Sequence, residues 1–300
     1  MTLPALAKIN LNLRVRGKRE DGYHELDTVF QTVSLHDTIR LSAIASSDIA
    51  FSCDDRSLPT DSHNLVVRAA TALRDRVNPK KGARIRLEKR IPTHAGLGGG
   101  SSDAAATLIG LTRLWELGLT RQELSELAAR LGADVPFFLH GGTARGTGIG
   151  DRLELLEDTP ETFLIIVKPN ANVSTADAYK ALEKPALTSP NSETILSRSE
   201  AKELFDNQHF ASLENDFEAA ALAAAPEIER AKAALMKAGA QASLLAGSGS
   251  AVFGIFDSED AQRRAIQAIE LETGWRVFPC KTVGREQYQA ALYSMSEACA

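Results

Sequence analysis

Cysteine is scarce in this chain of 300 residues, which contains three: Cys53, Cys280 and Cys299. They lie far apart and form no C-x-x-C pair, which argues against a disulfide framework and against a structural zinc site. Histidine spacings typical of metal sites, such as H-E-x-x-H, are also missing. We therefore expect reduced thiols, and the sequence leaves any metal ligands unknown.

Long apolar runs and a strong excess of one charge are missing too. No run approaches the roughly 18 residues of a membrane-spanning helix, and the N-terminus has no basic-then-apolar leader. We expect no membrane partner and a cytoplasmic location. Residues 1–90 carry 16 basic against 11 acidic residues within a chain of net charge −5, which suits an anionic small molecule. The excess is too weak to predict a nucleic-acid partner.

A hydrophobic content of 44% leaves ample material for one large or two ordinary domains. The acidic segment around 151–160 is the expected boundary, giving domains over 1–156 and 157–300. Either a monomer or a homodimer is compatible with the sequence.

Alternation of apolar and polar residues over 8–15 predicts a half-buried strand whose polar face carries Lys8, Asn10 and Asn12. Asparagine is disfavoured within strands, which favours a functional face, although a plain surface strand would alternate in the same way. Patterns elsewhere predict strands over 29–44, 83–87, 163–167, 244–246, 252–256 and 275–278, helices over 64–76, 101–115, 120–131, 226–238 and 261–271, and a loop over 184–199.

A glycine-rich segment lies between a predicted strand and a predicted helix. Glycines can adopt positive φ and bring backbone N–H groups close to a ligand, and the start of the next helix adds unpaired N–H groups and a positive dipole end. We expect Ser101 or Ser102 to cap that helix and Asp103 to lie in its first turn. The segment predicts a di- or triphosphate site. Its residues are Pro92, Thr93, His94, Ala95, Gly96, Leu97, Gly98, Gly99, Gly100, Ser101 and Ser102.

Two common phosphate motifs do not match this segment. No lysine follows the glycines as a P-loop requires, and Ser101 stands where the dinucleotide pattern needs its last glycine. A flexible linker or a tight packing turn is the remaining structural alternative.

Asp134 follows a predicted helix end and precedes Pro136. A carboxylate is unfavourable at the negative end of a helix dipole, so a distant cation such as Lys8 is an attractive partner. A solvated loop aspartate would look the same in sequence.

Aromatic residues gather downstream of the first strand. Tyr23, His24 and Phe30 could stack on a planar base, worth about 1 to 3 kcal/mol per base, or could belong to the core. The Gly247-Ser248-Gly249 stretch is either a hairpin turn or a second loop close to phosphate. The glycines of 141–148 have no assigned role.

Three stretches together resemble the GHMP kinase superfamily, which includes galactokinase, homoserine kinase and mevalonate kinase. They are A-K-I-N-L at 7–11 with D-G-Y-H at 21–24, G-L-G-G-G-S-S-D-A-A at 96–105, and L-G-A-D-V-P-F-F at 131–138. The loop at 247–250 is similar to the third superfamily motif, so the resemblance runs from residue 4 to about 256. D-G-Y-H and G-A-D-V-P-F-F resemble the members that phosphorylate a cytidine diphosphate-linked methylerythritol on the non-mevalonate route to isopentenyl diphosphate and other isoprenoids.

The resemblance implies an α+β fold of two domains with the active-site cleft between them. It implies ATP as co-substrate with Mg²⁺, and transfer of the γ-phosphoryl group to the 2-hydroxyl of the erythritol part. Lys8 and Asp134 would take the catalytic roles, and residues 92–102 would bind ATP. The small-molecule substrate would contact Asn10, Tyr23, His24, Phe30 and, after Val173-Ser174-Thr175, Tyr179.

Thr93 and His94 depart from the small residues typical of the family at these positions, which leaves the first contacts of the loop undecided. Two alternatives stay open: another GHMP small-molecule kinase, with homoserine or a sugar as acceptor, or a non-catalytic nucleotide-binding protein on the same scaffold.

Overall fold

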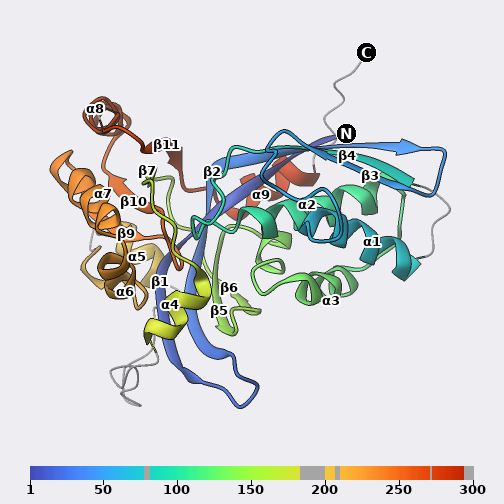
Figure 1. The fold of residues 1–300 in the computed structure, drawn as a ribbon, viewed down its shortest axis with the longest axis horizontal. Coiled ribbons are helices and arrows are strands. Elements are labelled where there is room, and N and C mark those ends of the chain that lie inside the picture. Colours follow the sequence, from blue (N-terminus) through green and yellow to red (C-terminus); the bar gives the residue numbers. More distant parts are fainter. Residues whose placement is uncertain (78–81, 183–199, 207–209, 271, 294–300) are drawn as a thin grey trace.

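Two β-sheets with helices packed against them make up the protein in the computed structural model (Figure 1). The structure describes residues 1–77, 82–182, 200–206, 210–270 and 272–293. The loop predicted over 184–199 and Cys299 lie outside these ranges. The presence of sheets and helices confirms the predicted α+β class.

In the larger sheet, the strands follow the order β3-β4-β2-β1-β8, and β5 pairs with both β2 and β6. Most neighbours are antiparallel, but β3 is parallel to β4 and β8 is parallel to β1. The strands are β1 (Thr2–Lys18), β2 (His24–Ile44), β3 (Ile49–Cys53), β4 (Gly82–Glu88), β5 (Thr143–Gly148), β6 (Arg152–Leu155) and β8 (Glu214–Asn215).

The smaller sheet is antiparallel, with the order β11-β7-β10-β9. Its strands are β7 (Phe163–Lys168), β9 (Ala242–Leu245), β10 (Val252–Phe256) and β11 (Arg276–Lys281). The apolar runs at 163–167 and 252–256 are buried along their length, except for the partly exposed Phe163, as expected for strands covered on both faces.

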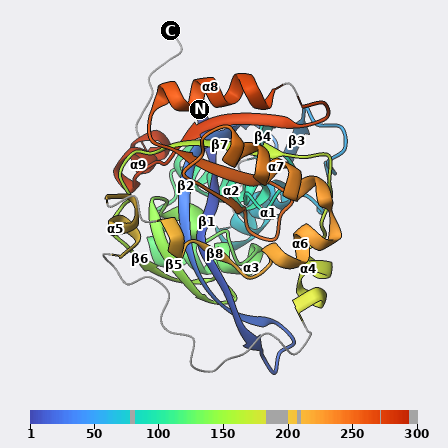
Figure 2. The same cartoon turned by 90° about the vertical axis from the view of Figure 1, so that its left-hand side faces the viewer.

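The helices form two groups, one for each sheet. α1, α2 and α3 lie together against the larger sheet, and α7 and α8 cover the outer face of the smaller one (Figures 1 and 2). Within the described residues no helix is both long and apolar enough to span a bilayer. The helices are α1 (Leu65–Val77), α2 (Gly99–Leu114), α3 (Arg121–Leu131), η1 (Phe137–Leu139), α4 (Thr175–Leu182), α5 (Glu200–Asp206), η2 (Phe210–Ser212), α6 (Glu218–Ala224), α7 (Pro226–Lys237), α8 (Glu259–Ile269) and α9 (Arg285–Tyr293).

β1 is longer and more deeply buried than its alternation predicts. Lys8, Asn10 and Asn12 are 4%, 1% and 3% exposed, so the prediction of a half-buried strand is wrong. Ile9 and Leu11 pack against β7 and β10 in a core between the sheets. Register shifts between Leu6 and Lys8 and between Asn10 and Asn12 mark β-bulges, which change the direction of nearby side chains.

α2 begins earlier than the serines predict. Its N-cap is Gly98, with φ of 68°, and no side chain caps the helix. Ser101 and Ser102 therefore lie inside the helix, and Asp103 lies beyond its first turn, contrary to expectation. α3 lies where the helix over 120–131 was expected and begins with a capping box: Thr120 Oγ1 accepts from the Glu123 N–H, and the Glu123 carboxylate accepts from the Thr120 N–H.

The C-terminal helix returns to the N-terminal part of the molecule. Tyr288 and Leu292 of α9 belong to the core of the larger sheet, and β8 also pairs with that sheet. The division at residue 156 stays a prediction, and these two segments cross it.

Tyr288 anchors α9 to the segment after α3, since its hydroxyl donates to the Phe138 carbonyl at 2.6 Å and its ring lies against Gly141. We expect Tyr288→Phe to lower the free energy of unfolding by about 1–3 kcal/mol, because the buried carbonyl loses its donor. Urea denaturation measures this change. Tyr293→Phe, at the exposed end of α9, is the matched control, and equal stability of the two variants would contradict the anchoring role.

Candidate active site

Lys8 and Asp134 meet, although they lie far apart in the sequence. The Lys8 Nζ is 3.6 Å from Oδ2 of Asp134. The Lys8 side chain is 5% exposed, whereas Asp134 is 31% exposed. Asp134 lies in the turn after α3, where the Val135 N–H donates to the Gly132 carbonyl. The pair therefore joins a buried ammonium to a carboxylate that a ligand can reach.

A chain of hydrogen bonds holds the Lys8 ammonium in place. Lys8 Nζ donates to Oδ1 of Asn10 at 2.8 Å, and Asn10 Nδ2 donates to Oγ1 of Thr28 at 2.7 Å. The Thr28 hydroxyl in turn donates to the Asn12 carbonyl. Each member is nearly fully buried, so the ammonium has little freedom to turn. This arrangement accounts for asparagines in mid-strand.

The glycine-rich loop is clamped between β1 and the 246–251 loop. The Lys8 N–H donates to the Leu97 carbonyl at 3.0 Å, and the Ala251 N–H donates to the Ala95 carbonyl at 3.3 Å. Gly96 has φ of 77°, and a Cβ there would lie 1.8 Å from the Ala246 carbonyl oxygen. The two loops predicted to lie near phosphate are thus in direct backbone contact, and only glycine fits at position 96.

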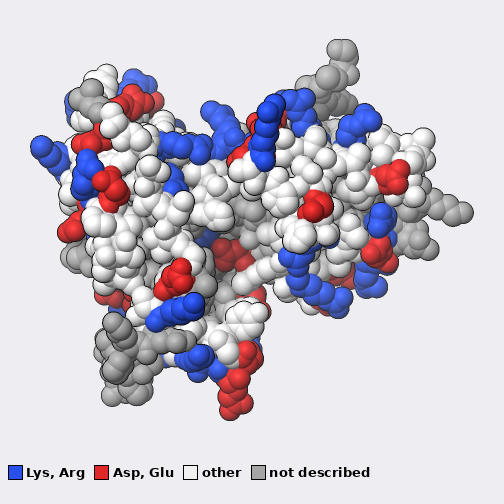
Figure 3. Space-filling model, in the orientation of Figure 1, with Lys and Arg blue, Asp and Glu red and all other residues white. Residues whose placement is uncertain are grey.

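Two cavities meet at this loop and share His94, Gly96 and Gly98 in their walls. The first, of about 580 Å³, contains Lys8 and Asp134. The second, of about 500 Å³, lies over the start of α2. Both sizes are in the usual range for small-molecule sites. The surface is correspondingly hollowed between the two halves of the molecule (Figure 3).

The predicted ATP-binding residues line the second cavity almost without a break. Its wall includes every residue from Pro92 to Ser101. Ser102 is absent from both walls: it is 1% exposed, and its hydroxyl donates to the Leu6 carbonyl. Gly247, Ser248 and Gly249 line the first cavity.

The predicted substrate-binding aromatics are only partly brought together. Phe30 and Tyr179 line the first cavity, and His24 stacks on Tyr179 with ring centroids 4.7 Å apart. Burial, reinforced by the Asp134 charge, raises the pKa of Tyr179 to about 12, so its hydroxyl stays protonated at neutral pH. Tyr23 is 62% exposed and lies outside both cavity walls, so the structure does not bring it into the site.

Sequence reasoning missed several residues of the cavity walls. Thr28 and Phe217 lie in the first wall, and Asn64 and Lys89 lie in the second. Asn64 directly precedes α1 and binds the Val66 N–H, a capping pattern that gives no sign of a cavity. Ile149 and Gly150 of the first wall follow the glycines of 141–148, which have no other assigned role.

The described residues contain no group of three or more His, Cys, Asp or Glu side chains able to hold a metal ion. Beside the backbone of the glycine-rich loop, the first cavity thus offers the Lys8 ammonium and the Asp134 carboxylate. That set can align a phosphate ester with a hydroxyl group.

Proteins of known name are similar to this chain over nearly its whole length. A 4-diphosphocytidyl-2-C-methyl-D-erythritol kinase from Syntrophotalea carbinolica is 43% identical over 284 residues, covering 93% of this chain and 98% of that protein. An enzyme of the same name from Citrifermentans bemidjiense is 42% identical over 94% of this chain and 99% of its own.

Solved structures agree with the sequence comparison. A crystal structure of 4-(cytidine 5'-diphospho)-2C-methyl-D-erythritol kinase superposes with a TM-score of 0.82 and 36% identity, covering 95% of this chain and all of that one. Homoserine kinase from Cytophaga hutchinsonii reaches a TM-score of 0.68 at 20% identity over 96% of both chains, which shows a shared fold.

Two protein-family models match stretches of this chain. "GHMP kinases N terminal domain" matches residues 64–142, and "GHMP kinases C terminal" matches residues 197–273. With the relatives and the shared fold, these matches place the glycine-rich loop and the Asp134 turn inside the first region and the 247–250 loop inside the second. The chain therefore belongs to the GHMP kinase family.

Proposed function

We propose that this protein is an ATP-dependent kinase that phosphorylates the 2-hydroxyl of 4-diphosphocytidyl-2-C-methyl-D-erythritol, on the non-mevalonate route to isopentenyl diphosphate. The observation that carries the proposal is the Lys8–Asp134 pair, placed beside the glycine loop that separates two cavities. Relatives above 40% identity over nearly the whole chain carry that enzyme's name. The free thiols of Cys53 and Cys280 fit a cytoplasmic enzyme.

The second cavity is the site we assign to ATP. Loop amides and the N-terminus of α2 supply unpaired N–H groups for the anionic phosphates. The shared wall at Gly96 and Gly98 lets the terminal phosphate reach the first cavity, where the acceptor would lie. Mg²⁺ would arrive with the nucleotide and take its ligands mainly from phosphate oxygens and water, because the described residues offer no cluster to hold it.

Phosphoryl transfer needs alignment and charge neutralisation more than covalent help from the protein. Asp134 accepts a hydrogen bond from the acceptor hydroxyl and finally takes its proton. The Lys8 ammonium stabilises the negative charge on that carboxylate and faces the charge that develops on the transferring group. A Cβ on Gly247 would lie 3.3 Å from the Lys8 Nζ, so the bare backbone there leaves room for these groups.

An acceptor panel tests the substrate. With ATP and Mg²⁺, we expect turnover with the cytidine diphosphate-linked methylerythritol and none with homoserine, mevalonate or galactose. Turnover of homoserine or a sugar alone would favour another GHMP kinase. ATP binding without turnover of any acceptor would favour a non-catalytic nucleotide-binding protein.

Asp134→Asn tests the role of the carboxylate. We expect kcat to fall roughly 100- to 10,000-fold, because the amide cannot accept the proton from the acceptor hydroxyl. Steady-state kinetics gives kcat, and circular dichroism confirms folding. Glu126→Gln, an exposed carboxylate of α3, is the control for loss of one negative charge. A folded Asp134→Asn enzyme with wild-type kcat would rule out this role.

Tyr179→Leu tests the aromatic contact with the cytosine. Loss of stacking worth about 1–3 kcal/mol should raise KM for the cytidine acceptor by roughly 5- to 150-fold, because the ring lies in the first cavity. KM for ATP should stay unchanged. Tyr293→Leu, outside both cavity walls, is the control. If both KM values of Tyr179→Leu moved together, the ring would not be a substrate contact.

A further inference from the structure

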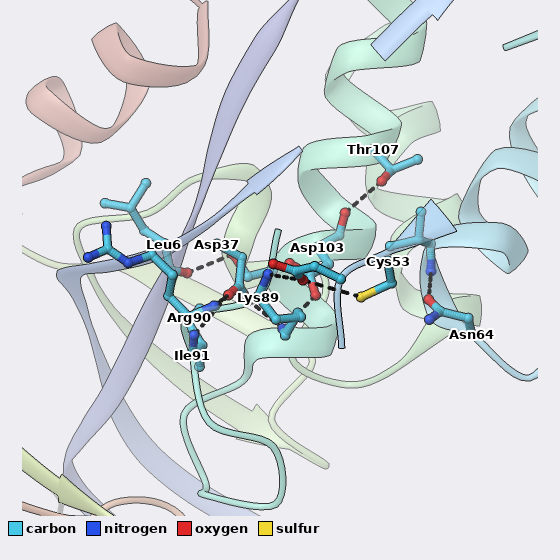
Figure 4. A network of polar contacts seen from close by, with 12 residues as sticks. Leu6, Asp37, Cys53, Asn64, Lys89, Arg90, Ile91, Asp103 and Thr107 are labelled. Atoms are coloured by element: carbon cyan, nitrogen blue, oxygen red, sulfur yellow. Dashed lines mark hydrogen bonds and ion pairs between the residues drawn. The ribbon is translucent and has the colours of Figure 1, made fainter. Parts of the chain in front are cut away.

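A buried ion cluster lies at the base of the glycine-rich loop. Lys89, which follows β4, donates to Asp37 of β2 and, at 2.8 Å, to Oδ2 of Asp103 of α2. The three side chains are 7%, 0% and 3% exposed. Figure 4 shows Lys89 between the two carboxylates, which come from opposite sides of it.

This cluster joins the entry of the loop to its exit. Oδ1 of Asp37 accepts the N–H groups of Arg90 and Ile91, where the chain leaves β4 for the loop. Asp103 lies in α2, where the chain has just left the loop. Lys89 bridges the two carboxylates, so one ammonium fixes the separation of the loop ends.

The cluster also lies directly beneath the amides that we assign to phosphate binding. A Cβ on Gly99 would lie 3.3 Å from the Lys89 Nζ, and Lys89 and Asp103 both line the second cavity. Oδ1 of Asp103 is buried and has no hydrogen-bond partner among the described residues. A buried charge costs several kcal/mol unless it is well paired, so packing alone does not explain an incompletely satisfied carboxyl here.

We propose that Lys89 and Asp103 are positioning residues for ATP: their contact holds the two ends of the glycine-rich loop at the separation that lets its amides reach the phosphates. The inference rests on the proposed use of the second cavity for ATP. It assigns no contact with the nucleotide to either side chain.

The position of Asp103 has a consequence for pH. Burial above all, and then the charge of Asp37, raises the pKa of Asp103 to about 8, against the opposing effect of Lys89. A protonated Asp103 carboxyl still accepts the hydrogen bond from Lys89, whereas its ionisation at higher pH adds a second negative charge beneath the anion site. Further titratable groups near the cluster are Asp54, which accepts the Lys89 N–H, the adjacent Cys53 of β3, and His63 and His94 on the cavity wall.

Binding of a non-hydrolysable ATP analogue with Mg²⁺, measured by calorimetry between pH 6.5 and 9, tests the proposal without an acceptor. For the wild type we expect Kd to rise roughly fivefold or more across pH 8, because the new charge repels phosphate. Asp103→Asn imitates the neutral carboxyl, so it should keep the neutral-pH affinity and lose this rise. Any rise due to Cys53, the histidines or the nucleotide itself would persist in Asp103→Asn.

Asp103→Ala removes the contact with Lys89 and should raise Kd for the analogue about tenfold at pH 7, whereas KM for the acceptor should stay within about twofold. Glu88→Gln is the matched control, because this neighbouring carboxylate pairs with Arg40 at the surface. It should behave as the wild type at every pH.

Wild-type pH dependence in Asp103→Asn, or wild-type affinity in a folded Asp103→Ala, would overturn the positioning role. Should Asp103→Ala fail to fold, the pH dependence of Kd for the ATP analogue in Asp103→Asn, compared with that in Glu88→Gln, still tests the proposal. Failure of the wild type to phosphorylate the cytidine acceptor, with analogue binding as expected, would refute the proposed substrate and leave the positioning role standing. No binding by the wild type would refute both.

Discussion

The contact between the Lys8 ammonium and the Asp134 carboxylate depends on the fold rather than on its own strength. An ion pair with one partly exposed partner contributes little, about 0–1 kcal/mol for surface pairs, so attraction alone would not hold these segments together. Hydrogen bonds of the surrounding strands and loops hold these segments together instead. Asn10 and Thr28 orient the ammonium, and the backbone of β1 binds the glycine-rich loop through Leu97. The pair is thus set in place before a substrate arrives, which is what catalysis by alignment requires.

The glycine-rich loop is the second element on which the site depends, and it is held from several directions. β1 and the 246–251 loop clamp its backbone, while the Lys89 cluster closes its base. Positive φ at Gly96 and Gly98, and the close approach to Ala246, leave no room for side chains. A loop constrained in this way can present its amides in one geometry, so little conformational entropy need be lost when an anionic ligand binds.

Local patterns predicted most elements well because their causes are local. The helix over 120–131, the strand over 163–167 and the helix over 226–238 were all found at or near their expected bounds. The predicted cap at Ser101 or Ser102 was wrong. The prediction used the side-chain preferences of N-cap residues, whereas this helix begins after Gly98, whose backbone has a left-handed conformation. The alternation in β1 predicted a solvent-facing side, but Lys8 and Asn10 on that side are buried and line the first cavity. Tyr23 belonged to a convincing aromatic cluster, yet lies largely in solvent.

By itself, the sequence determined the residue types of the site and indicated the family. The glycine-rich segment, the isolated aspartate and the polar strand face are each recognisable within a short stretch of residues. Only the tertiary structure decided which of these stretches meet. Lys8 reaches Asp134, the 247–249 loop joins the first cavity, and α9 crosses back to the larger sheet through long-range packing that no local pattern encodes. The same holds for Lys89 and Asp103: each looks like an ordinary surface charge in sequence, and burial between three elements makes them a pair.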